Sequence, residues 1–461
     1  MTASTKKGAA EGTDAGTAAA PVPDVPALDA DALLDDQDIR IVVCCGSGGV
    51  GKTTTAAALG VRAAERGRKV VVLTIDPARR LAQSMGIDSL DNIPRRVPGI
   101  DGEGAGELHA MMLDMKRTFD EIVEAHADGD RARAILENPF YQSLSAGFAG
   151  TQEYMAMEKL GQLRVRNEWD LIIVDTPPSR SALDFLDAPK RLGSFLDGKF
   201  IKLLMAPAKM GGRAGMKFLN VGMSMMTGTL GKLLGGQFLR DVQTFVAAMD
   251  TMFGGFRTRA DATYKLLQAP GTAFLVVATP ERDALREAAY FVERLAAEEM
   301  PLAGLVLNRV HGSGAARLSA ERALAAAENL DDIGIVDQTA GKAGLRDPDG
   351  SAVTSPEDPE SPLSPARSAQ TEDPEHEPAS EPEPEAEAVS VEQLTAGLLR
   401  LHAERMQVVA REQRTRDRFT ALHPEVAVTE VAALPGDVHD LAGLRAIGDR
   451  LATGSAPAGA A

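Results

Sequence analysis

The feature that most constrains the fold is a glycine-rich stretch between a run of β-branched residues and an alanine-rich segment. Residues 39–45 ahead of it are predicted to form a buried parallel strand, and residues 53–66 behind it a helix that ends at a glycine. A strand–loop–helix unit of this kind directs backbone N–H groups and the positive end of a helix at phosphate oxygens. The stretch matches G-x-x-x-x-G-K-[ST] and predicts a nucleotide-binding loop made of Gly46, Ser47, Gly48, Gly49, Val50, Gly51, Lys52, Thr53 and Thr54.

Four side chains have predicted roles in binding and hydrolysing a nucleoside triphosphate. Lys52 supplies a positive charge to the β- and γ-phosphates, and the Thr53 hydroxyl is placed to ligate Mg²⁺. Asp175 ends the apolar run 171–174 and fits the Walker B role of holding Mg²⁺ through a water molecule. Asp76 ends the run 69–75 and could orient or deprotonate the attacking water. Either aspartate could instead cap the helix that follows it.

Apolar strands alternate with helices along most of the chain, which predicts an α/β fold with a doubly wound, mainly parallel sheet. Further strands are expected at 273–278 and 302–307, with another candidate at 426–431. Two stretches, about 108–165 and 190–264, lack strand signals. We expect them to form a helical subdomain attached to the sheet.

Composition divides the chain into segments. Residues 1–37 are rich in Ala, Asp and Pro and are predicted to be a disordered tail, with residues 456–461 as a second tail. The ATPase domain is expected over 38–346 and again over 391–455. Between these parts, residues 347–390 carry thirteen acidic residues and one arginine, and we predict a disordered acidic insert there.

Charge and cysteine content exclude several classes of function. The net charge of −17 argues against nonspecific nucleic-acid binding, although most of it lies in the acidic insert. Cys44 and Cys45 are adjacent and are the two cysteines of the chain, so they cannot supply a Cys-x-x-Cys zinc site and are expected to be buried. No run of 18 apolar residues and no signal peptide is evident, which favours a cytoplasmic protein.

Three ordered motifs resemble those of the arsenite-pump and tail-anchored-protein-targeting ATPases, a family within the dimeric P-loop class. They are residues 46–54, residues 74–78 (TIDPA) and residues 175–179 (DTPPS). Residues 110–114 (AMMLD) and 434–444 (LPGDVHDLAGL) resemble later blocks of the same family. The resemblance covers most of 38–340 and 393–455.

The resemblance implies functions for individual residues. It makes Asp76 the hydrolytic residue of switch I and Asp175 the start of switch II. It places Asn308 against the adenine of ATP and Pro435 in the loop over the base. It also implies ATP and Mg²⁺ as the bound species.

One departure from the family pattern concerns dimerisation. The family usually has a lysine where this chain has Ser47, and that lysine crosses the dimer interface to the partner's nucleotide. Two interpretations remain open: the chain pairs with a paralogue that keeps the lysine, or it hydrolyses ATP slowly as a homodimer. It could also be a regulatory subunit that binds ATP without hydrolysing it. Arsenite transport is disfavoured because that chemistry needs a thiolate site, and the zinc clamp of the eukaryotic targeting factors is absent.

The stretch from Met205 to Met252 carries eight of the seventeen methionines. Flexible, polarizable methionines suit a groove for varied apolar helices, and in the targeting factors this layer binds a hydrophobic transmembrane helix. The stretch could instead pack against itself. Transient adsorption to a membrane is a third interpretation, supported by the nearby basic residues Lys202, Lys209, Arg213 and Lys217.

Overall fold

The computed structural model describes residues 26–75, 80–102, 104–139, 141–142, 151–177, 255, 258–340 and 390–453. Asp76, the methionine-rich stretch and residues 347–389 lie outside these ranges, so the predictions made for them stay predictions. The described residues form two compact units. Unit 1 comprises those within Met1–Gly312 and Val409–Ala461, and unit 2 those within Ser313–Val408.

Unit 1 is built on a single eight-stranded sheet with the order β3-β4-β2-β5-β1-β6-β7-β8. Every pair of neighbours is parallel except β3 and β4. The strands are β1 (Ile41–Cys45), β2 (Lys69–Thr74), β3 (Arg95–Arg96), β4 (Glu107–Met112), β5 (Leu171–Asp175), β6 (Thr272–Ala278), β7 (Leu302–Val310) and β8 (Val428–Ala432). The predicted mainly parallel α/β sheet is therefore confirmed.

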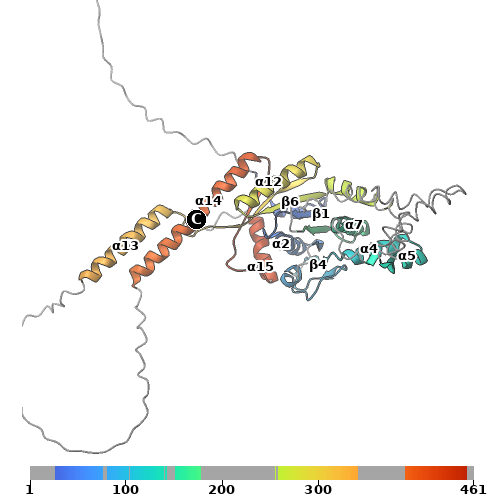
Figure 1. Ribbon diagram of the computed structural model, residues 1–461, viewed down its shortest axis with the longest axis horizontal. Coiled ribbons are helices and arrows are strands. Elements are labelled where there is room, and N and C mark those ends of the chain that lie inside the picture. The colour runs from blue at the N-terminus through green and yellow to red at the C-terminus, as the bar shows by residue number, and fades with distance from the viewer. Residues whose placement is uncertain are drawn as a thin grey trace, which may run out of the picture. The chain divides into compact units, whose positions relative to one another are not determined.

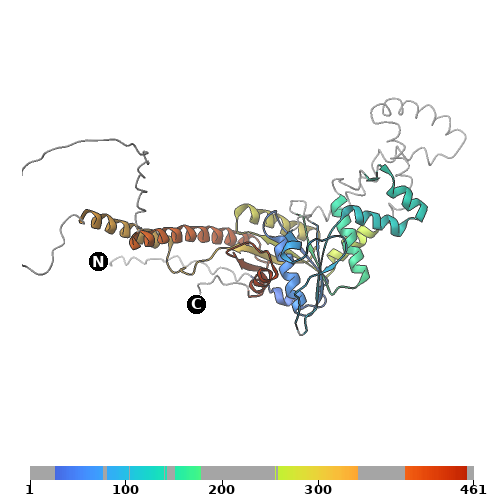
Figure 2. The ribbon, with the colours of Figure 1, turned by 90° about the horizontal axis from the view of Figure 1, so that it is seen from below.

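Both faces of the sheet are buried, because alternate residues of each strand point into one of two apolar layers. One layer is closed by α1 (Ala30–Asp35), α2 (Lys52–Glu65), α3 (Arg80–Ser84) and α15 (Leu441–Thr453). The other is closed by α4 (Met115–His126), α5 (Gly129–Leu136), α7 (Thr151–Arg166) and α12 (Arg282–Ala297), together with helical residues 258–268. Figures 1 and 2 show α2 beside α15 on one side of the strands. This is the doubly wound arrangement.

The prediction that residues 108–165 contain no strand was wrong at its start. β4 pairs in parallel with β2, and Leu108 pairs with Val70 in this register. Its burial alternates, with Leu108 and Ala110 fully buried and His109 half-buried against Trp169. A short strand near the edge of a sheet has a mixed pattern that local periodicity does not reveal. Helices α4, α5 and α7 confirm the mainly helical prediction for the described residues after β4.

The prediction of a disordered N-terminal tail was wrong for its last residues, because helix α1 packs within unit 1. Asp29 caps α1 by accepting from the Ala32 amide, and Leu34 is fully buried. The buried Arg68 guanidinium donates to the Leu34 carbonyl at 2.9 Å. Asp31 and Arg62 form an ion pair. These partners lie more than 30 residues away in the sequence, so the segment's own composition did not predict its docking.

Unit 2 is a helical hairpin of α13 (Ala320–Ala340) and the first part of α14 (Val391–Leu422). The two helices lie side by side in both views (Figures 1 and 2). Arg400 pairs with Asp331, and the His402 ring contacts the Leu318 carbonyl at 2.8 Å, which fixes an antiparallel arrangement. The predicted single ATPase domain over 38–346 and 391–455 is thus divided, since 313–408 is a unit of its own. No helix among the described residues is both long and apolar enough to cross a membrane.

Candidate phosphate-binding site

The predicted P-loop connects β1 to α2, and at two of its glycines, Gly46 and Gly51, a side chain would clash with neighbouring atoms. Gly51 caps α2 with φ of 97°, in the left-handed region. A Cβ on Gly51 would lie 2.2 Å from the Asn308 side-chain nitrogen, and one on Gly46 would lie 2.1 Å from the Val277 carbonyl oxygen. The loop therefore packs its backbone directly on β6 and β7, with Gly48 and Gly49 exposed on the other side.

Lys52 is the first residue of α2 and is only 5% exposed. Its ammonium donates to the Ser47 carbonyl at 2.8 Å, so its charge lies inside the curve of the loop. The Lys52 ammonium and the backbone of the loop therefore lie close together, as phosphate binding requires. Ser47 is half-buried.

Asp175 is the last residue of β5, which lies between β1 and β2 in the sheet. It pairs in register with Cys44 of β1 and with Thr74 of β2, and it is fully buried. Its Oδ2 accepts from the Thr53 hydroxyl at 2.7 Å and from the Thr74 hydroxyl at 2.9 Å. The structure thus brings together the two residues predicted to hold Mg²⁺.

Thr74 was missed as a site residue, although a signal was present. It is a buried hydroxyl at the end of β2, directly after the apolar residues Val70 to Leu73. Its bond to Asp175 fixes the rotamer of that carboxylate, because a buried carboxylate needs donors. Leu113, after β4, donates its amide to the Thr74 carbonyl at 2.9 Å, so the position of Thr74 is itself secured by the sheet.

The donor set at this point fits Mg²⁺ bound together with phosphates. Thr53 and Asp175 offer a hydroxyl and a carboxylate oxygen, and oxygen is the ligand that Mg²⁺ prefers. Mg²⁺ usually takes one or two carboxylates and completes its shell with water and phosphate oxygens. Within the described ranges, no group of three or more His, Cys, Asp or Glu residues is placed to hold a metal ion.

Asn308 supports the P-loop from β7. Its side-chain amide donates to the Val50 carbonyl at 2.8 Å, and its oxygen accepts from the Arg309 amide at 3.0 Å. It is 5% exposed. The expected contact with adenine stays a prediction, and so does that of Pro435, which is exposed in the segment after β8. β6 and β7 separate β8 from β1.

The two cysteines lie within the sheet beneath the loop. Both are free and fully buried, as predicted. Burial raises the pKa of the Cys44 thiol well above its ordinary value and the pKa of Cys45 to about 12. The carbonyl of Cys44 accepts from the Thr176 hydroxyl at 2.9 Å, which ties the residue after Asp175 to β1.

Helix α7 contacts the segment that leads into the predicted switch I. The Gln152 side-chain amide donates to the Ile75 carbonyl at 2.9 Å, and the Ile75 amide donates to the Asp175 carbonyl at 3.0 Å. Gln152 thus contacts the residue that precedes Asp76 in the sequence, and Asp76 itself lies outside the described residues. Sequence analysis did not identify Gln152, because a glutamine in the first turn of a helix carries no distinguishing pattern.

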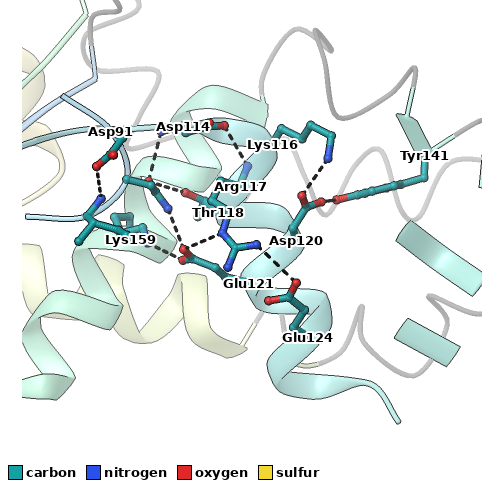
Figure 3. Close-up of polar contacts among 12 residues, drawn as sticks. Asp91, Asp114, Lys116, Arg117, Thr118, Asp120, Glu121, Glu124, Tyr141 and Lys159 are labelled. Carbon is teal, nitrogen blue, oxygen red and sulfur yellow. Dashed lines mark hydrogen bonds and ion pairs between the residues drawn. The ribbon is translucent and has the colours of Figure 1, made fainter. Parts of the chain in front are cut away.

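Buried ion pairs fix α7 to its neighbours. Figure 3 shows the Lys159 ammonium meeting Glu121 of α4, at 2.6 Å. Lys159 is 4% exposed, and burial lowers its pKa. Glu158, which directly precedes Lys159, accepts from the Tyr154 hydroxyl at 3.0 Å and from Arg259 at 2.7 Å. Arg259 lies in helical residues 258–268, the first described helix after the methionine-rich stretch. Helix α7 therefore contacts both Ile75, which leads into the predicted switch I, and the helix formed by residues 258–268.

Comparisons with known proteins agree with this geometry. A sequence model described as anion-transporting ATPase matches residues 39–322. A protein of Malassezia globosa named ATPase GET3 is 29% identical over 160 residues, which cover 35% of this chain and 45% of that protein. Proteins of the same name from Podospora anserina and Schizosaccharomyces pombe are 25% and 26% identical over 283 and 279 residues. Each of these two matches covers 60% of this chain and 75% of the relative.

Proposed function

Since this chain belongs to the anion-transporting ATPase family, a family of P-loop ATPases, we propose that it hydrolyses ATP with Mg²⁺ and uses a dimer to handle a hydrophobic client. The observation that carries the proposal is the cluster of Thr53, Asp175 and Thr74 beside the P-loop. These groups lie where the β- and γ-phosphates would meet the start of α2.

The residues of the chain have distinct parts in the proposed reaction. Amides of the loop and the Lys52 ammonium bind the phosphates, and Lys52 exchanges its present acceptor, the Ser47 carbonyl, for phosphate oxygen. Thr53 and Asp175 would hold Mg²⁺, which neutralises charge on the phosphates when bound. Thr74 keeps the Asp175 carboxylate in place. Asp76 orients the attacking water, as the resemblance to the family implies.

The hydrophobic client is proposed from the methionine-rich stretch and from the resemblance to targeting ATPases. A thiolate-based arsenite site is not favoured, because both thiols are buried and have raised pKa values. The contacts of α7 supply a route by which a change at Ile75 would reach Arg259. This route supports coupling between nucleotide state and the client layer.

The test is steady-state ATP turnover by the purified full chain with Mg²⁺. Wild type should exceed the Lys52→Ala background, and Asp175→Asn should fall to that background because the amide lacks the charge that holds Mg²⁺. Asp31→Asn is the matched control, since it neutralises a paired aspartate on α1, outside the site. Turnover by Asp175→Asn equal to wild type would refute the assignment.

The absence of the lysine at position 47 supports a second candidate, a subunit that binds ATP but needs a paralogue for turnover. Ser47→Lys distinguishes the two, because it restores a cation that can reach the partner's nucleotide. If the chain is a homodimer that lacks this charge, Ser47→Lys should raise its ATP turnover at least about tenfold. If wild type is at background and Ser47→Lys stays there while ATP still binds, the chain is a binding subunit.

A further inference from the structure

Arg309 is a strained residue within a strand. Among the described residues that are not glycine, those with φ in the left-handed region are Asn167, Glu299 and Arg309. Asn167 directly follows α7 and Glu299 lies in the turn after α12, where left-handed residues commonly end helices. Arg309 instead lies inside β7 with φ of 59°, a conformation that strains the backbone of any residue with a side chain. Strain of this kind gathers at ligand sites.

A β-bulge places Arg309 at the carboxyl end of β7. Asn308 pairs with Val431, and the next pair joins Val310 to Ala432. Arg309 is therefore an extra residue between two positions of the ladder. Val310 packs against the apolar layer, and Arg309 is left exposed.

Two loops flank Arg309. Its amide donates to the Asn308 side-chain oxygen at 3.0 Å, and the Asn308 side-chain nitrogen donates to the Val50 carbonyl of the P-loop at 2.8 Å. On the other side, the Ala433 amide donates to the Val310 carbonyl at 2.9 Å, at the start of the segment after β8. The Arg309 guanidinium has no hydrogen bond or ion pair with another described residue, so it is available to a ligand between these loops.

The order of the strands places the base of a nucleotide, rather than its phosphates, near Arg309. Thr53 and Asp175, which are predicted to hold Mg²⁺, meet at β5, and β1 and β6 separate β5 from β7. Three steps of about 4.8 Å between strands put β7 roughly 14 Å from β5. On the opposite side of β5, the Gln152 side chain covers the carboxyl end of β2 by donating to the Ile75 carbonyl. The sugar and base therefore extend toward β7.

We propose that Arg309 binds the nucleotide by stacking its guanidinium on the purine ring. A guanidinium is planar and always charged, and it stacks on aromatic faces, including those of bases. The phosphates have the Lys52 ammonium and the P-loop amides, so the exposed cation at the far end of the site serves the base. The inference rests on the proposed function, because it assigns a further residue to the same ATP site.

The test is calorimetric titration of the full chain with MgATP, MgADP and magnesium tripolyphosphate. Arg309→Gly should lose about fivefold or more in affinity for both nucleotides, within the range of a cation on an aromatic ring. It should bind tripolyphosphate as wild type does, because that probe has no base, whereas Lys52→Ala should weaken all three. Equal losses for tripolyphosphate and the nucleotides would show that Arg309 acts on phosphates and would overturn the assignment to the base.

Glu299→Gly is the matched control for the backbone, since Glu299 is exposed and has φ of 54° but lies outside the site. Both glycine variants should raise the midpoint of urea unfolding, because glycine adopts this conformation without strain. Arg309→Gly alone should lose nucleotide affinity. A lower midpoint for Arg309→Gly together with lost affinity would show that its side chain supports the fold, and would overturn the role in binding.

Arg322→Ala controls for the loss of positive charge, since Arg322 is exposed on α13. An equal loss of affinity in this variant would trace the effect to net charge and overturn the proposal. Wild type that binds no nucleotide would refute the proposed function as well. Wild type that binds MgATP, with Arg309→Gly binding it equally well, would refute this inference alone.

Discussion

Substitution of Gly51 by alanine tests how the P-loop is built, because two separable penalties meet at that residue. The first is conformational: φ of 97° is left-handed, and a non-glycine residue there costs about 1–2 kcal/mol. The second is steric: the new Cβ would lie 2.2 Å from the Asn308 side-chain nitrogen and would displace it. Displacement breaks the bond to the Val50 carbonyl and leaves buried polar groups unpaired, at about 1–3 kcal/mol.

Gly49→Ala is the matched control, since Gly49 has φ of 79° but nothing within 4 Å of its would-be Cβ. Its free energy of unfolding should fall by the conformational cost alone, about 1–2 kcal/mol. Gly51→Ala should lose about 2–5 kcal/mol in the free energy of unfolding, the sum of both parts. The difference between the two variants measures the contact with Asn308.

The assay is urea unfolding followed by the fluorescence of Trp169, the single tryptophan of the chain. Trp169 is 7% exposed and packs against His109 in unit 1, so its signal reports the sheet. Asn308→Ala should make Gly51→Ala less damaging, because the atom that the Cβ meets is gone. If Gly51→Ala and Gly49→Ala lose the same stability, or if the Asn308→Ala effect simply adds, the proposed packing of Asn308 on the loop is wrong.

Three further predictions concern other parts of unit 1. At pH 8 a thiol reagent should leave Cys44 and Cys45 unmodified in the native protein and label both in urea, because burial raises their pKa values; labelling of the folded chain would contradict this. Gln152→Ala should lower turnover while ATP affinity is kept, since the Ile75 carbonyl loses its donor; an unchanged rate would show that this contact does not position switch I. The hydrogen bond from Arg62 holds the pKa of Asp31 below its ordinary value, so Asp31 stabilises α1 above about pH 4 and loses this effect as pH falls through the lowered pKa. The protection factors of the α1 amides, which correct hydrogen exchange for its intrinsic pH dependence, should accordingly fall in acid, and Asp31→Asn should remove that dependence.

Local chemistry sufficed to predict the P-loop and the strands that position it. Lys52 and Thr53 follow a glycine-rich turn after a continuous apolar run, and Asp175 ends another such run. Each is defined by its neighbours in sequence, because backbone conformation and burial of a strand depend on a few consecutive residues. Six strands were therefore predicted within a few residues of their observed bounds.

The tertiary structure decided which of these residues meet. Parallel register places Thr74 and Cys44 on either side of Asp175, and a register between distant strands leaves no trace in a single sequence. The same reason explains why Asn308 supports Val50 from 258 residues away and why α1 docks on Arg62 of α2.

The sequence by itself determined the residues that bind phosphate and the strands that carry them. The tertiary structure decided their partners, because contacts between distant segments depend on how the whole sheet assembles.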